Sequence, residues 1–179
     1  MQDYASLASA TEGWILFEQG KTEAGLELVR HSAPILLEQG DPWKPSLMGL
    51  CASVLGRDGT GEEGLELLDA SLAHFQANQV HWWDAELYRI KGELLLTGGA
   101  RTADDGEACL LQALDIARQQ EARSLELRAA TSLAGLWRDR GKEAEARDLL
   151  RPIVQWFPDD LTFADLTAAK RLLEALDVR

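Results

Sequence analysis

An internal repeat is the feature of this sequence that most constrains its fold. The stretch GWILFEQGKTEAGLELV at 13–29 aligns without a gap to ASVLGRDGTGEEGLELL at 52–68. In both stretches a small residue comes first, a glycine follows seven places later, and a second glycine follows five places after that. A pattern that recurs at a fixed interval predicts a structural unit that recurs with it.

Two later copies extend the repeat through the rest of the chain. The positions equivalent to the second glycine are separated by 39, 42 and 40 residues, and they are Gly25, Gly64, Gly106 and Ala146. Another small residue precedes each of them by twelve positions, or by fourteen in the third copy: Gly13, Ala52, Gly92 and Ala134. Small residues let two backbones approach closely. Each copy is therefore expected to be a tightly packed pair of segments.

The segments are predicted to be helices. Leu, Ala, Glu, Gln and Arg, which favour helices, are abundant, and Leu and Ala recur at spacings of three and four. No sustained alternation of Val, Ile and Thr predicts a strand. Glycines and prolines interrupt the pattern at regular places. The predicted helices are 3–19, 22–39, 43–56, 61–78, 82–97, 103–120, 122–140, 142–156 and 162–177.

The repeat pattern resembles the tetratricopeptide repeat (TPR), a helical hairpin with small, large and glycine residues at fixed positions. The matching residues are Gly13, Leu16, Gly20, Gly25 and Ser32 in the first copy, and Ala134, Trp137, Gly141, Ala146 and Ile153 in the fourth. The third copy departs from the pattern at Lys91, where we expect Ile90 to provide the apolar contact instead. The resemblance implies an all-α, right-handed solenoid of about four hairpins with a C-terminal capping helix.

A single domain is expected over 1–179. One helical hairpin cannot bury its apolar face alone, whereas stacked hairpins form a continuous core, and no Ser-, Pro- or Gly-rich linker separates them. The expected repeats are 3–41, 42–80, 81–121 and 122–157, followed by a capping helix at 160–178. Thr162 and Asp165 are expected to form a capping box at the start of that helix.

A narrower resemblance concerns the segments 82–96, 107–150 and 156–176. They look like the C-terminal TPR region of large bacterial signalling ATPases that are fused to nucleotide cyclase, kinase or DNA-binding domains. The chain has no phosphate-binding loop of the G-x-x-x-x-G-K-[ST] form. The resemblance implies a bacterial signal-transduction module that acts with an attached or associated ATPase or effector domain.

Composition narrows the class of partner. The chain has 179 residues, a net charge of −12 and 46% hydrophobic residues. Such acidity argues against nonspecific binding to nucleic acid, which depends on neutralising phosphates. No apolar run approaches the roughly 20 residues of a membrane span. The start MQDYASLASATEG does not resemble a signal peptide. We therefore expect a cytoplasmic protein with no nucleic-acid or membrane partner.

No motif indicates catalysis, a cofactor or a metal. His31, His74 and His81 lack cysteines or carboxylates at ligand spacing. The acidic pairs 62–63 and 104–105 lie at helix starts, where the helix dipole explains them. Cys51 and Cys109 are expected to be buried small hydrophobes, and a redox pair would require them to be adjacent in space. We expect a protein that is not an enzyme.

The TPR resemblance implies that the first helix of each hairpin lines a concave groove. The groove residues carried over from it are Trp14, Phe17, Ser53, Arg57, Glu86, Arg89, Glu93, Arg128, Thr131 and Arg138. Mixed charges with two aromatic rings suit a peptide or helix of complementary charge. The alternative is that Glu86, Arg89 and Glu93 satisfy one another, because they are spaced three and four apart.

The tryptophans also have two interpretations. Trp82 and Trp83 can pack at a hairpin junction, one in the core and one as its cover, or they can anchor a partner. The same choice applies to Trp14, Trp43, Trp137 and Trp156.

The function favoured by the sequence is a sensing module that binds a protein or peptide partner in its groove. Two alternatives remain open at this point. A sensor of a small-molecule inducer predicts a closed pocket with convergent polar groups. A self-assembling scaffold predicts exposed apolar residues at an end repeat.

Overall fold

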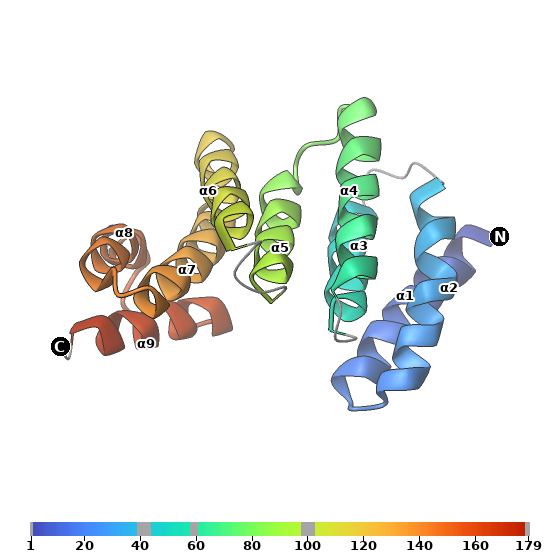
Figure 1. The fold of residues 1–179 in the computed structure, drawn as a ribbon, viewed down its shortest axis with the longest axis horizontal. Coiled ribbons are helices and arrows are strands. Elements are labelled where there is room, and N and C mark those ends of the chain that lie inside the picture. The colour runs from blue at the N-terminus through green and yellow to red at the C-terminus, as the bar shows by residue number, and fades with distance from the viewer. Residues whose placement is uncertain (1, 39–43, 58–60, 98–102, 178–179) are drawn as a thin grey trace.

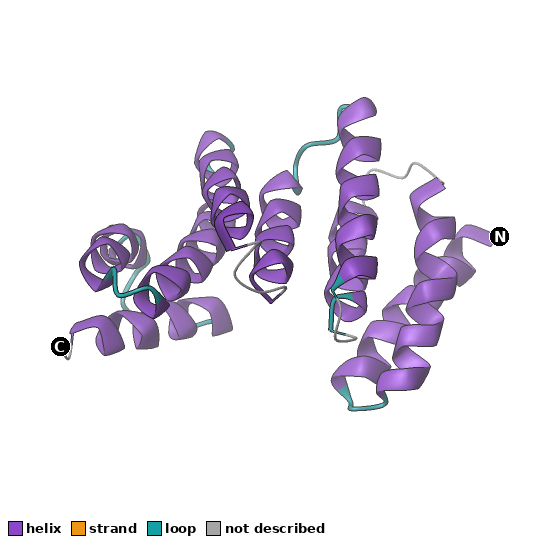
Figure 2. Ribbon diagram, viewed as in Figure 1, coloured by secondary structure: helices purple, strands orange, loops and turns teal. Residues whose placement is uncertain are grey.

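The chain is an array of helices that follow one another along its longest axis (Figure 1). The structure is a computed structural model that describes residues 2–38, 44–57, 61–97 and 103–177. These residues form nine helices and no strand, and short turns join the helices where the connecting residues are described (Figure 2). The two chain ends lie at opposite ends of the array. The prediction of an all-α solenoid is therefore confirmed.

Each helix begins and ends within two residues of its predicted bounds. The helices are α1 (Gln2–Glu18), α2 (Thr22–Glu38), α3 (Lys44–Leu55), α4 (Glu62–Ala77), α5 (Asp84–Thr97), α6 (Ala103–Gln119), α7 (Arg123–Asp139), α8 (Glu143–Gln155) and α9 (Ala164–Asp177). None of them is long and apolar enough within the described residues to span a lipid bilayer.

Small residues lie where the two helices of a hairpin are closest. A Cβ added to Gly25 in α2 would lie 2.7 Å from the carbonyl oxygen of Gly13 in α1. A Cβ on Gly64 would lie 2.6 Å from the carbonyl oxygen of Ala52. Gly92 and Gly106 meet in the same way in the third hairpin (2.9 Å). The small residues of the repeat therefore lie where the backbones of the two helices of a hairpin approach most closely, as the sequence predicts.

The odd-numbered helices form one continuous layer. Consecutive odd-numbered helices contact each other, from α1 to α3, α5, α7 and α9. Within the described residues, α4 does not contact α6, and α6 does not contact α8. We call the side of the array formed by the odd-numbered helices the odd-helix face. A side chain on this face can meet side chains from the next hairpin.

Two main apolar clusters form the core. The first extends from α1 to α5 and the second from α5 to α9, and Tyr88 on α5 packs against both. Ile90 is 5% exposed and belongs to the first cluster. The neighbouring Lys91 instead pairs with Asp69 of α4 at 2.5 Å. Ile90 thus provides the apolar contact that the sequence predicts for the third hairpin.

Four of the described helices end in the same left-handed turn. A residue with positive φ follows the helix, and the next amide donates to the carbonyl five positions earlier at 2.8–2.9 Å. The four residues with positive φ are Gly20, Gln79, Glu121 and Gly141, at 82°, 58°, 54° and 74°. This is the Schellman arrangement, which usually places glycine at that position. Gln79 and Glu121 adopt the same positive φ, although a residue with a side chain disfavours it.

The expected capping box in α9 is wrong. The amide of Thr167 donates to the carbonyl of Phe163 at 3.0 Å, so Phe163 rather than Thr162 caps the helix. The helix begins at Ala164, which leaves Asp165 in the first turn with its side chain directed toward α7.

Candidate interaction site

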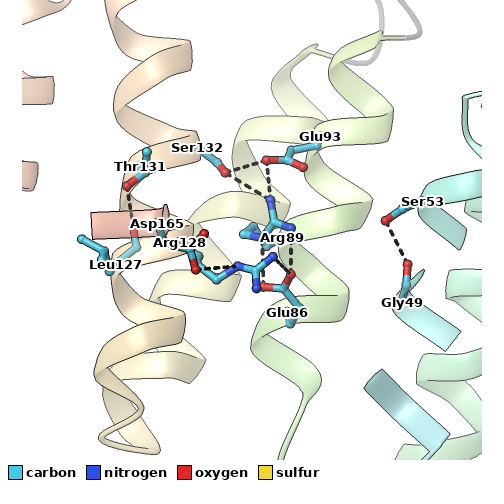
Figure 3. Close-up of polar contacts among 10 residues, drawn as sticks. All are labelled: Gly49, Ser53, Glu86, Arg89, Glu93, Leu127, Arg128, Thr131, Ser132 and Asp165. Carbon is cyan, nitrogen blue, oxygen red and sulfur yellow. Dashed lines mark hydrogen bonds and ion pairs between the residues drawn. The ribbon is translucent and has the colours of Figure 1, made fainter. Parts of the chain in front are cut away.

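The polar centre of the odd-helix face is built around Glu86. This residue lies in the first turn of α5, where the helix dipole favours a carboxylate. Its side chain is only 4% exposed. Arg89, one turn later, donates to both carboxylate oxygens at 2.9 and 2.7 Å. Arg128 of α7 pairs with the same carboxylate at 2.7 Å, so that two cations compensate one buried charge (Figure 3).

Arg89 is fully engaged by its neighbours. Besides its two bonds to Glu86, it donates to Glu93 and lies 3.4 Å from the hydroxyl of Ser132. Burial opposes the charge of the guanidinium, but hydrogen bonds and charge attraction from Glu86 and Glu93 outweigh it. The pKa of Arg89 therefore lies above its usual value. Mutual satisfaction of Glu86, Arg89 and Glu93, the alternative left open by the sequence, is what the structure shows.

A second contact joins the third and fourth hairpins. The hydroxyl of Ser132 on α7 donates to Glu93 on α5 at 2.7 Å. Together with the pair between Arg128 and Glu86, it fixes α7 against α5 at two points. The polar groups of this region are thus held in place before any partner arrives, which favours selective recognition.

A pocket of about 190 Å³ opens beside this network. Its lining comes from α5, α7 and α9, and consists of Arg89, Glu93, Arg128, Thr131, Ser132, Asp165 and Ala168. Asp165 lies 3.9 Å from the Nε of Arg128, and both side chains are partly exposed. The pocket therefore presents two carboxylates, two guanidinium groups and two hydroxyls at the junction of three helices.

The predicted groove residues fall into separate groups. Five of them come together at this pocket and its network: Glu86, Arg89, Glu93, Arg128 and Thr131. A second group lies at the other end of the array, where the guanidinium of Arg57 is 5.7 Å from the ring centre of Phe17 and pairs with Glu18 at 2.9 Å. Trp14 packs against the first core cluster.

The remaining two predicted residues belong to neither group. Ser53 donates to the carbonyl of Gly49 in its own helix at 2.9 Å. Arg138 is exposed near the end of α7 and pairs with Asp139 at 2.7 Å. Both lie on odd-numbered helices, as predicted, but neither contributes to the pocket beside Arg128.

Three residues of the pocket were not predicted from the sequence. Ser132 follows the predicted Thr131 and lies one turn after Arg128, so helical spacing could have suggested it. Asp165 and Ala168 come from α9, and their positions depend on how α9 packs against α7. No spacing within the chain predicts that packing angle.

The tryptophans divide between the two interpretations. Trp83 packs against the core, and Trp82 covers it with 40% of its surface exposed. Trp137 packs against the second cluster and donates to Glu107 at 2.7 Å. Trp156 is 57% exposed, with the guanidinium of Arg123 lying 5.3 Å from its ring centre. Trp43 lies outside the described residues.

Neither cysteine lines the pocket. Cys51 is buried in α3 and Cys109 is half-buried in α6, and both are free thiols. No group of three or more His, Cys, Asp or Glu residues in the described part of the chain is arranged to hold a metal ion. The arrangement at the pocket is suited to noncovalent recognition of polar groups.

The fold of this chain is similar to that of a solved structure. The crystal structure of a kinesin light chain-like protein of Podospora anserina, with nearly identical TPR-like repeats, superposes with a TM-score of 0.70. The match covers 94% of this chain and 83% of that one, at 17% sequence identity. Models of known families give no match, and neither do curated protein sequences. The chain thus has a TPR-like solenoid fold.

Proposed function

We propose that this chain is a protein-interaction module whose odd-helix face forms a groove for a protein or peptide partner. The observation that carries the proposal is the contact pattern of the helices. Odd-numbered helices touch their odd-numbered neighbours along the whole array, whereas among the even-numbered helices of the described residues α2 touches α4 but α4 does not touch α6, nor α6 α8. Helices that are close on one side and spread on the other curve an array toward the close side, which makes a concave surface.

The position of the polar site supports the same proposal. The pocket beside Arg128 opens on the odd-helix face and joins three helices. Its side chains are already held in place by bonds to one another, so partner binding requires little reordering of side chains.

We further propose that the residues 1–179 act as one domain and that the module serves a bacterial signalling protein in the cytoplasm, acting with an attached or associated ATPase or effector domain. The sequence resemblance to the repeat region of signalling ATPases supports this setting.

Selection of peptides on the purified chain tests the proposal. Peptides displayed on phage are selected on the original chain and then measured by fluorescence anisotropy on two variants. Ala168→Arg places a long side chain at the pocket, whereas Ala73→Arg adds the same side chain at an exposed position on α4. We expect selected peptides to lose at least tenfold in affinity on Ala168→Arg and to keep their affinity on Ala73→Arg. Equal affinity for both variants would contradict the proposal.

One observation favours self-assembly as a second candidate. Tyr4, Leu7 and Ile15 are 79%, 41% and 42% exposed, and their spacing places them on one face of α1. A row of exposed apolar side chains on an end helix is suited to contact with another chain. Light scattering over a hundredfold concentration range tests this candidate. A molar mass that rises with concentration in the original chain, but not in Leu7→Glu, would support it, and a constant mass of one chain would exclude it.

A further inference from the structure

We propose that the pocket between α5, α7 and α9 binds the positively charged side chain of a lysine or arginine in the partner. This inference rests on the proposed function and specifies the chemistry of the partner. Two groups of side-chain atoms around the pocket are compared for this purpose: the donors, which are largely occupied, and the acceptors, which are still available.

The donors of the network are largely occupied. Arg89 is 11% exposed and directs its guanidinium to Glu86, Glu93 and Ser132. Arg128 pairs with Glu86 through Nη2, and its Nε lies 3.9 Å from Asp165, beyond hydrogen-bond distance. The hydroxyl of Thr131 donates to the carbonyl of Leu127 within α7 at 2.7 Å. An incoming acceptor therefore finds little donor capacity in the pocket apart from the outer part of Arg128.

The acceptors of the pocket are available. The side chain of Glu93 is 46% exposed, and the bonds it receives from Arg89 and Ser132 both go to Oε1. No donor among the described residues reaches its Oε2. Asp165 is 44% exposed, and its described ion pair is the long contact with Arg128. Two partly exposed carboxylates thus line the pocket with lone pairs that an ammonium or guanidinium group would fill.

The charge balance favours a cation as well. Arg89 and Arg128 are opposed by the carboxylates of Glu86, Glu93 and Asp165, so the group as a whole has an excess of one negative charge. The whole chain carries a net charge of −12, which attracts cations from a distance and repels anions. A carboxylate entering the pocket would approach Glu93 and Asp165 and would be repelled by both.

The size of the pocket indicates a side chain rather than a whole ligand. A volume of about 190 Å³ is below the roughly 300–1,000 Å³ of typical small-molecule sites. The aliphatic part of a lysine or arginine can lie along Ala168 and the methyl group of Thr131 while the charged end meets the carboxylates.

The first test uses capped amino acids as probes for the pocket alone. N-acetyl-lysine methylamide, its arginine counterpart and N-acetyl-glutamate methylamide are titrated into the isotopically labelled chain and followed by NMR. The two basic probes are expected to shift the amides of Thr131, Ser132 and Asp165 in a saturable manner, and the glutamate probe is not. Glu93→Gln and Asp165→Asn are each expected to weaken the lysine probe about threefold. Glu145→Gln, an exposed neutralisation on α8, is expected to leave it unchanged.

The second test uses the peptides selected on the whole chain. Their anchoring residue is expected to be lysine or arginine, and replacing a lysine by the uncharged norleucine is expected to lower affinity about tenfold. On a Glu93→Gln/Asp165→Asn double variant, the same replacement is expected to change affinity less than twofold. This difference separates a charge contact in the pocket from a general attraction to an acidic protein.

The two tests separate failure of this inference from failure of the proposed function. Peptides that bind the odd-helix face through an acidic or apolar anchor would overturn the inference and leave the groove intact. Saturable binding of the lysine probe at the pocket, with no peptide selected, would support the inference and count against the groove. Absence of both a basic anchor and any saturable shift at 50 millimolar probe would overturn the inference.

Discussion

Arg128 on α7 and Glu86 on α5 form an ion pair of 2.7 Å that links the third hairpin to the fourth. Because the carboxylate of Glu86 is 4% exposed and pairs with both arginines, removal of Arg128 would leave its charge compensated by Arg89 alone, and removal of Glu86 would take away the buried partner that the two arginines share. The network beside the pocket therefore contributes both to the packing of the array and to the surface it presents. The variants that test binding are placed at its edge for this reason.

Neutralising Glu86 is expected to destabilise the chain. In Glu86→Gln the amide oxygen can still accept, but the amide nitrogen takes the place of one carboxylate oxygen and the negative charge between two guanidinium groups is lost, at a cost of about 2 kcal/mol in the free energy of unfolding. Urea denaturation followed by circular dichroism measures it. The matched control is Glu18→Gln, which breaks an exposed pair with Arg57 and is expected to cost at most about 1 kcal/mol. Equal losses would show that the buried network has no special weight.

Adding a methyl group where helices are closest is expected to be costly. Gly25→Ala would place a Cβ 2.7 Å from a backbone oxygen of α1, and should lower the free energy of unfolding by about 1–3 kcal/mol. Gly135→Ala in α7 meets nothing within 4 Å and should gain up to about 1 kcal/mol from helix propensity. Thermal and urea unfolding of both variants would measure these changes. A gain in stability for Gly25→Ala would contradict the close approach of α1 and α2.

The left-handed turns predict a stabilising substitution. Gln79 and Glu121 have φ of 58° and 54°, where a side chain is disfavoured. Gln79→Gly is expected to raise the free energy of unfolding by about 1 kcal/mol, whereas Gly141→Ala at an equivalent turn is expected to lower it by a similar amount. Ala77→Gly in the last turn of α4 serves as the control, and it should destabilise. A loss of stability in Gln79→Gly would contradict the assigned turn.

The thiol of Cys51 is expected not to react with thiol reagents in the folded chain. Burial in α3 raises its pKa from 9.0 to about 12, because the apolar surroundings disfavour the thiolate. In a Cys109→Ser variant at pH 8, labelling by a thiol reagent should require global unfolding and should speed up with urea. Because the folded pKa is the higher one, this group favours the folded state below pH 9, and its contribution is lost as pH rises toward 12. Rapid labelling without urea would contradict the burial of Cys51.

Much of the fold could be predicted because the sequence marks it locally. The pairing of Gly13 with Gly25 is visible as a repeat, since each hairpin needs small residues at its point of closest approach. The sequence signal for the ends of α4 and α6 is weaker, because Gln79 and Glu121 adopt a positive φ that is typical of glycine. Their turns are determined by packing on either side rather than by the residue itself.

The site could be predicted only in part because it depends on how hairpins are arranged relative to one another. Spacing within one helix brings Glu86, Arg89 and Glu93 together, and those contacts are present. The contribution of α9 depends on its angle to α7, and Asp165 was assigned instead to a local cap. Residues that meet across hairpins leave no periodic signal in the sequence.

The most direct test of the account is an NMR map of the chain bound to the tightest selected peptide. If the odd-helix face is the binding surface, amide shifts should extend along α3, α5, α7 and α9 and include Thr131 and Asp165 beside the pocket. The same peptide should leave the Ala168→Arg variant unshifted there. Shifts confined to α4, α6 and α8, and retained in Ala168→Arg, would contradict the central claim.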